Sequence, residues 1–209
     1  MNICRLCPRS LCVAALCAFL LSSCLTPVTT LHTLQPVRQQ PLGQDFADFS
    51  ALILLMPVRL APHLQGRGLF GRLPGGASRA STTHLWAGPL NEQIGQQMVN
   101  SIRDLLATDN IGLYPGPRFA DVRYQLEVEI NEFSGDGHAF TIVAVYTVSD
   151  SAAKTILTRK TFHQTQTIDK SGYSGYVTHA SQSVADLSRE AATALLDAHR
   201  SQPAAKPKP

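Results

Sequence analysis

The most regular pattern of apolar and polar positions lies between Val122 and Phe133, where the two kinds of residue alternate. Side chains of a β-strand point alternately to its two faces, so this pattern predicts a strand with one buried and one solvated face. The Ser-Gly-Asp-Gly sequence at 134–137 tolerates the tight turn of a hairpin. Apolar and threonine-rich segments follow at Phe140–Val148 and Thr155–Thr167, so we expect a three-stranded antiparallel meander.

Two longer segments repeat their apolar residues at helical spacings of three and four. The first follows Gly88-Pro89, where proline is favoured at the first helical position, and it should stop near residue 109. The second runs from about Gly175 to His199, after a Gly172–Gly175 segment that we expect to be a mobile hinge. The apolar stripes are Leu90, Ile94, Met98, Ile102, Leu105 and Leu106 in the first helix, and Val177, Ala180, Val184, Leu187, Ala191 and Ala194 in the second.

Shorter apolar segments predict the remaining strands. Ala51–Val58 is apolar on both faces and indicates a buried central strand, while Leu31–Leu34 and Ile111–Tyr114 indicate short strands, the first at a sheet edge. Residues 59–81 are rich in glycine and predict a loop with a short extended piece around Leu69-Phe70. A second extended piece is expected at Thr82–Trp86. Together these elements predict an α+β fold, a mixed, largely antiparallel sheet of four or more strands with two long helices packed on one face.

The N-terminal residues have the layout of a secretory signal. Arg5 and Arg9 precede the uncharged apolar run Leu11–Leu21, which is too short to span a membrane. The run ends in Leu21-Ser22-Ser23-Cys24, which resembles the bacterial lipoprotein box. That resemblance implies that Cys24 becomes the first mature residue and carries acyl chains such as palmitate, which would anchor the protein to a membrane. The alternative is that Cys24 is one more cysteine of a cysteine-rich leader.

The lipoprotein box divides the chain into four parts. They are a signal peptide over 1–23, a lipidated tether over 24–30, a single α+β domain over 31–199 and a disordered Pro/Lys-rich tail over 200–209. No Asp follows Cys24; in lipoproteins of this kind an Asp there favours inner-membrane retention, so we expect the periplasmic face of the outer membrane in a Gram-negative bacterium.

Composition narrows the function classes. A hydrophobic content of 44% with 16% charged residues fits a packed globular domain. The five cysteines all lie within the first 24 residues, so the predicted body has no disulfide. Without Arg5 and Arg9 the formal net charge falls from +3 to +1, which leaves no basic footprint for binding nucleic acid.

The sequence contains no recognisable catalytic or metal-binding set. The seven histidines form no zinc motif, and we expect neither a metal nor another cofactor. Gly66, Gly68 and Gly71 have dinucleotide-motif spacing, but the Pro-Gly-Gly at 74–76 leaves no room for the helix that such a site needs. Ser174, set among glycines, lacks the full nucleophile-elbow motif. We therefore expect that the protein is not an enzyme, with a periplasmic hydrolase as a less favoured alternative.

The candidate contact residues lie in the glycine-rich segment. Arg59, Arg67, Leu69, Phe70 and Arg72 mix positive charge with apolar surface, which suits contact with a partner protein or with lipid headgroups, or an ordinary solvated edge. Trp86 and Pro89 are expected to be structural residues that fix the entry to the first helix.

Three segments carry a resemblance to a known family. They are Leu31-His32-Thr33-Leu34, the Met56–Leu64 segment, and Leu85-Trp86-Ala87-Gly88-Pro89-Leu90. With the lipoprotein box and the order of elements, the chain resembles the PqiC/YmbA-like auxiliary lipoproteins of MCE-type ABC transport systems. It departs from them at residues 65–68, where Asp-Arg-Pro is usual, and at Leu85, where arginine is usual.

The resemblance implies a non-catalytic subunit anchored in the outer membrane. Such a subunit docks an MCE-domain protein that spans the periplasm, supports lipid transport between membranes and membrane integrity, and leaves the channel and the ATPase to other subunits. Assembly into a homo-oligomer is compatible with this role. The alternative is a structural or assembly lipoprotein of another cell-envelope complex.

Overall fold

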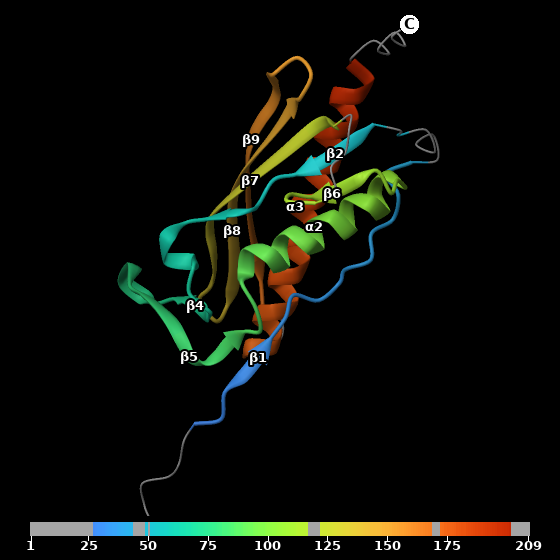
Figure 1. Cartoon of the computed structure of the whole chain (residues 1–209). Helices are drawn as coiled ribbons and strands as arrows, with labels where there is room; N and C mark the ends of the chain where they lie inside the picture. The colour runs from blue at the N-terminus through green and yellow to red at the C-terminus, as the bar shows by residue number, and fades with distance from the viewer. Residues whose placement is uncertain (1–26, 44–48, 50, 117–121, 169–171, 202–209) are drawn as a thin grey trace, which may run out of the picture.

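Nine strands form one mixed sheet in the computed structural model, which describes residues 27–43, 49, 51–116, 122–168 and 172–201 (Figure 1). Cys24 and the predicted signal peptide lie outside the described residues. The strands are β1 (Thr30–His32), β2 (Leu52–Leu55), β3 (Arg59–Leu60), β4 (Gly68–Arg72), β5 (Ser78–Trp86), β6 (Ile111–Leu113), β7 (Val122–Gly135), β8 (Ala139–Asp150) and β9 (Thr155–Thr167). The helices are α2 (Leu90–Leu106) and α3 (Tyr173–Ser201), and two short 3-10 turns are η2 (Pro62–Leu64) and η3 (Pro74–Gly76).

The long strands β7, β8 and β9 form the predicted antiparallel meander. Leu126 lies opposite Val148, and Val148 lies opposite Thr158. The apolar positions of β7 face the core, since Tyr124 and Ile130 are at most 1% exposed, while the polar positions between them stay partly exposed. The alternation in the sequence thus marks the two faces of the sheet.

Strand β2 occupies the predicted central position. It pairs in parallel with β7 on one side and with β6 on the other. Ile53 and Leu55 are fully buried, whereas Leu52 and Leu54 are only partly covered. The α+β prediction is confirmed: the sheet combines parallel and antiparallel pairs, and two long helices cover it.

Residues 59–81 were expected to form a loop with a short extended piece around Leu69-Phe70, followed by a second at Thr82–Trp86. The two extended pieces are confirmed as parts of β4 and β5, but the expectation of a loop around them is wrong. Residues 59–81 contain β3, β4 and the beginning of β5, and β4 and β5 form an antiparallel hairpin through η3. The sequence hides this hairpin because Gly68 and Gly71 interrupt the apolar pattern. A Cβ atom on Gly68 would lie 2.4 Å from the backbone oxygen of Ser81, so the close pairing of the two strands requires glycine at this position. Strand β1 pairs in parallel with β5 at the edge of the sheet.

The two helices pack side by side on the sheet (Figure 1). The side-chain amide of Gln97 on α2 donates a buried hydrogen bond of 2.7 Å to the backbone oxygen of Ser181 on α3. Pro89 takes the N-cap position, one residue before the predicted one. The proposed hinge before the second helix is wrong, because α3 already begins at Tyr173. Its first turn is fixed by packing of Tyr176, whose backbone N–H bonds to the Gly172 oxygen at 3.2 Å.

Candidate functional site

A groove lies between the β4–β5 hairpin and the start of α3. Figure 1 shows β4 and β5 near β1, at the end of the molecule where the described chain begins. The β4–β5 hairpin forms one wall, the β7–β8 turn and the start of α3 form the other, and the volume is about 450 Å³. We call it the hairpin groove. It is lined by Leu69–Leu73, Arg79, Ser81–Thr83, Gly135–Gly137, Ile168, Gly172, Tyr173 and Tyr176. Its size falls within the range of small-molecule sites in proteins.

Tyr176 joins the walls of the hairpin groove. Its hydroxyl donates to the backbone oxygens of Phe70 on β4, at 3.0 Å, and Phe133 on β7, at 3.3 Å. Burial raises the pKa of the Tyr176 hydroxyl, which keeps it protonated and therefore a donor. Its ring packs edge-on against Phe140, with centroids 5.0 Å apart. The hairpin is thus attached to the body by a buried aromatic side chain of the helix.

Gly135 makes this packing possible. A Cβ atom at this position would lie 2.9 Å from Cδ2 of Tyr176, closer than side chains tolerate. Gly135 also pairs with Gly71 in the parallel contact between β4 and β7. Gly135 therefore lets the meander and the helix approach each other beneath the groove, next to the strand pair that joins the hairpin to the meander.

The rim of the hairpin groove exposes apolar side chains. Leu73, after β4, is 46% exposed, and Tyr173, on the first turn of α3, is 41% exposed. The Tyr173 ring stacks on His84 with centroids 3.6 Å apart, which holds it at the rim. Leu31, within β1, and Val28, before this strand, are also exposed at this end of the molecule. Four of the six exposed large hydrophobic residues in the described part of the chain thus gather at one end.

Charged groups lie beside this apolar surface. Arg72 forms an ion pair with Glu132 at 2.9 Å, with the Arg72 side chain 55% exposed. Arg79, also on the hairpin, is exposed and has no ion pair with any described acidic residue. Hydrogen bonds from the backbone N–H groups of Ala139 and His138 lower the pKa of Asp136 in the β7–β8 turn, so this carboxylate is already occupied.

The structure separates the five predicted contact residues into two groups. Leu69, Phe70 and Arg72 line the hairpin groove. Leu69 is 2% exposed and belongs to its floor, whereas Phe70 is partly buried and packs against the His63 ring with centroids 5.1 Å apart. Of the five predicted contact residues, one basic and two apolar residues therefore meet at the hairpin groove.

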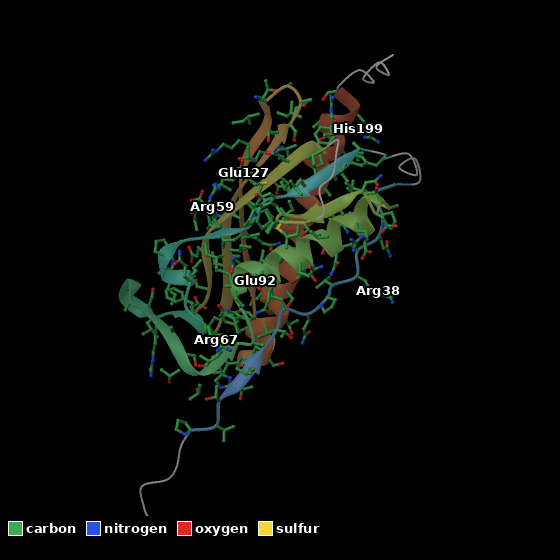
Figure 2. All side chains as sticks on the ribbon, viewed as in Figure 1. Arg38, Arg59, Arg67, Glu92, Glu127 and His199 are labelled. Atoms are coloured by element: carbon green, nitrogen blue, oxygen red, sulfur yellow. The ribbon has the colours of Figure 1, made fainter. Side chains whose placement is uncertain are left out.

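Arg59 and Arg67 lie elsewhere (Figure 2). Arg59 lies on β3 and pairs with Glu127 at 3.3 Å and Glu129 at 3.4 Å on the polar face of β7, and these hydrogen bonds raise the pKa of its guanidinium. Arg67 donates from Nε and Nη2 to the backbone oxygen of Trp86 at 3.3 Å, so it closes the end of β5. Neither arginine lines the hairpin groove.

The two predicted structural residues flank the junction of sheet and helix. Trp86 is 1% exposed and packs near Phe133 and Tyr176, with centroids 6.3 and 6.4 Å away. The backbone oxygen of Pro89 accepts from the N–H of Gln93 at 3.2 Å in the first turn of α2. Trp86 therefore lies in the aromatic cluster beneath the hairpin groove and before the helix.

The geometry offers no support for a serine hydrolase centred on Ser174. This residue is exposed on the first turn of α3, and in the described part of the chain no histidine bonds to its hydroxyl. No group of three or more metal-ligating side chains occurs among the described residues. Likewise, none of the helices in the described ranges combines the length and the hydropathy needed to cross a bilayer.

Sequence reasoning missed part of the site. Tyr173 was assigned to a hinge, and Tyr176 fell at the start of the predicted helix without a role, although aromatic residues at the start of a long helix are a signal for packing against a neighbouring element. Leu73 and Arg79 gave little signal, because only the hairpin brings them to the same groove as the start of α3.

The sequence profile of ABC-type transport auxiliary lipoprotein components matches residues 32–192. The chain belongs to this family. An auxiliary lipoprotein of this kind is a component of an ABC-type transport system and is held at a membrane of the cell envelope. No curated protein sequence matches the chain.

Two solved structures share the fold of this auxiliary lipoprotein. An uncharacterized protein is 19% identical, with a TM-score of 0.68, over 81% of this chain and 99% of its own. A protein from Xanthomonas campestris is 15% identical, with a TM-score of 0.70, over 82% of this chain and 97% of its own. The whole length of each neighbour is therefore accounted for by the domain described above.

Proposed function

We propose that this auxiliary lipoprotein is a non-catalytic subunit of an MCE-type ABC transport system. Acylated at Cys24, it is held at the periplasmic face of the outer membrane, where it docks the MCE-domain protein and supports lipid movement between the membranes. It contributes by anchoring the system at the membrane and by binding the partner protein, while other subunits supply the channel and the ATPase. Envelope integrity depends on it through that transport.

The observation that carries this proposal is the location of the exposed apolar surface. Thr30, the first residue of β1, lies six residues after Cys24, and an extended stretch of six residues spans at most about 20 Å. The hairpin groove, Leu31 and Tyr173 occupy the same end of the molecule as β1. An acylated Cys24 would therefore hold this apolar end close to the bilayer.

The opposite end of the molecule would then point into the periplasm. It carries the β8–β9 turn and the last turns of α3 (Figure 1). The polar face of β7, with Arg59 paired to Glu127 and Glu129, lies along the side between the two ends (Figure 2). These surfaces are the ones available to a protein partner once the groove end faces lipid.

Site-specific crosslinking in intact envelopes tests the proposal. A photoreactive amino acid at Arg59 or Ile156, both exposed, should capture the MCE-domain protein of one transport system, identified by mass spectrometry. Capture of components of a different envelope machine would favour a structural or assembly role instead. The same label at the groove residue Leu73 is the matched control and should capture the MCE-domain protein far less.

Two substitutions test the anchor and the absence of catalysis. Cys24→Ser should leave the leader uncleaved and abolish fatty-acid labelling, and continued labelling would contradict the anchor.

Ser174→Ala should leave transport-dependent growth unchanged, because Ser174 has no catalytic partner among the described residues. Loss of function in a folded Ser174→Ala protein would instead favour a hydrolase.

A further inference from the structure

We propose that the hairpin groove binds one acyl chain of a phospholipid from the anchoring membrane. This inference rests on the proposed function, since it requires the protein to be held at a bilayer through Cys24. It makes the auxiliary lipoprotein a lipid-binding subunit as well as a tether.

The shape and the lining of the groove suit a hydrocarbon chain. Leu69 and Tyr176 form a buried floor, and Leu73 and Tyr173 stand exposed on opposite walls. The volume of about 450 Å³ lies within the range of sites that hold small molecules. Leu73 and Tyr173 would lose contact with water on binding, which is the main driving force for such a ligand.

The charges at the groove fit the phosphate of a lipid headgroup. Arg79 is exposed and has no ion pair with any acidic residue in the described ranges, and Arg72 is more than half exposed beside Glu132. A guanidinium can donate two parallel hydrogen bonds to a phosphate. Both arginines lie on the hairpin wall, so a phosphate bound there would leave the acyl chain to run over the apolar floor.

The path of the chain brings the bilayer to this groove. Strand β1 runs parallel to β5 with Thr30 opposite His84, so the residues before Thr30 lead toward the side of Thr83 and Thr82. Both threonines line the groove. The polypeptide that leads to Cys24 thus leaves the domain beside the groove, and the lipid nearest to the anchor is also the lipid nearest to the groove.

Photocrosslinking from the lipid tests this proposal. The lipidated chain is reconstituted into vesicles of phosphatidylethanolamine and phosphatidylglycerol that contain a phospholipid with a diazirine near the end of one acyl chain. After irradiation, crosslinked peptides are mapped by mass spectrometry. We expect adducts on the groove walls, in residues 69–73, 81–83 and 173–176, in addition to adducts on the tether.

Replacement of an exposed apolar residue by glutamate, at one position in the groove and at one outside it, provides the matched comparison. Leu73→Glu should reduce groove adducts about tenfold, because a carboxylate at the rim opposes both the chain and the phosphate. Ile156→Glu makes the same change at a residue that is 64% exposed at the start of β9, outside the groove, and should leave the adducts unchanged. Both positions are exposed, so neither variant should prevent folding.

The outcomes separate the inference from the function on which it rests. Adducts confined to the tether, residues 24–30, would overturn lipid binding in the groove and leave the anchored role standing. Equal groove adducts in the Leu73→Glu and unaltered proteins would also overturn it. A protein that is not acylated and does not associate with the vesicles would contradict the anchored function itself.

Discussion

The two ends of this auxiliary lipoprotein differ in how far their polar groups are bonded and their apolar side chains are covered. At the β8–β9 end, Asp150 is 3% exposed, pairs with Arg123 at 3.1 Å and accepts hydrogen bonds from the backbone N–H groups of Ala152 and Ala153 at 2.9 Å. At the hairpin end, Leu73 and Tyr173 stay exposed around an open groove. At the first end the buried carboxylate is fully bonded within the chain and Ile156 is the exposed large apolar residue, whereas at the second end several apolar side chains stay exposed around the groove.

The attachment of the two regions differs as well. The meander and helices share a continuous core that also includes Leu69 and Trp86 of the hairpin. Beyond these two side chains, the hairpin pairs with β7 only at Gly71–Gly135 among the described residues and is held by the Tyr176 hydroxyl and the Arg72–Glu132 ion pair. From this difference we expect the body to carry most of the stability, and the proposed contact surface lies at the hairpin end. Perturbing each link in turn tests that division.

The largest effect is expected at Trp86, where the body meets the hairpin. Trp86 is 1% exposed and lies in an aromatic cluster with Phe133 and Tyr176. Trp86→Ala should lower the free energy of unfolding by about 3–5 kcal/mol, measured by urea denaturation, because it leaves a cavity in the core. A loss below about 1 kcal/mol would mean that the core does not extend to this junction.

A smaller and more local effect is expected at Tyr176. Tyr176→Phe removes the donor to the backbone oxygens of Phe70 and Phe133 and should cost about 1 kcal/mol. In hydrogen exchange, amides of β4 and β5 should lose protection while those of β8 keep it. Uniform loss of protection would show that hairpin and body unfold together, which contradicts the comparison.

The Arg72–Glu132 ion pair should contribute still less to the free energy of unfolding. Arg72 is 55% exposed, and exposed ion pairs stabilise proteins by at most about 1 kcal/mol. Arg72→Ala should therefore change the urea midpoint only slightly. Arg123→Ala is the control at the other end, and it should cost more because it leaves the buried Asp150 without its ion-pair partner.

The smallest effect concerns pH at the edge strand. Burial and the neighbouring charge of His84 lower the pKa of His32, which bonds to His84 at 3.0 Å and lies near the Tyr173 ring. His32 is therefore protonated more readily in the unfolded chain than in the folded protein. The free energy of unfolding should fall as the pH drops below about 6.5. His32→Asn should flatten this slope in unfolding experiments. An unchanged slope would mean that other groups cause it.

The regular elements could be predicted from the sequence because their patterns are local. The alternation from Val122 to Phe133 and the helical spacing from Leu90 to Leu106 each reflect a single buried face. The pairing of β4 with β5 was missed, because Gly68, which serves close backbone approach, and Gly71 interrupt the apolar pattern.

The site was only partly predictable for a related reason. Phe70 and Arg72 stood out by composition, but they form a groove only with Tyr173 and Tyr176, about a hundred residues later in the chain. Arg59 and Arg67 belong to the same sequence segment as Arg72, yet the strands direct them to ion pairing and to the end of β5. Which residues share a groove is set by tertiary structure.

Fluorescence quenching at two single cysteines tests the central claim most directly. Cys24 is the only cysteine after the predicted leader, and the proposed acylation would block its thiol, so a label at Leu73→Cys or Ile156→Cys would be unique. In vesicles that carry a spin-labelled lipid, the account predicts strong quenching of a fluorophore at position 73 and little at position 156. Equal quenching at both positions, or stronger quenching at position 156, would contradict it.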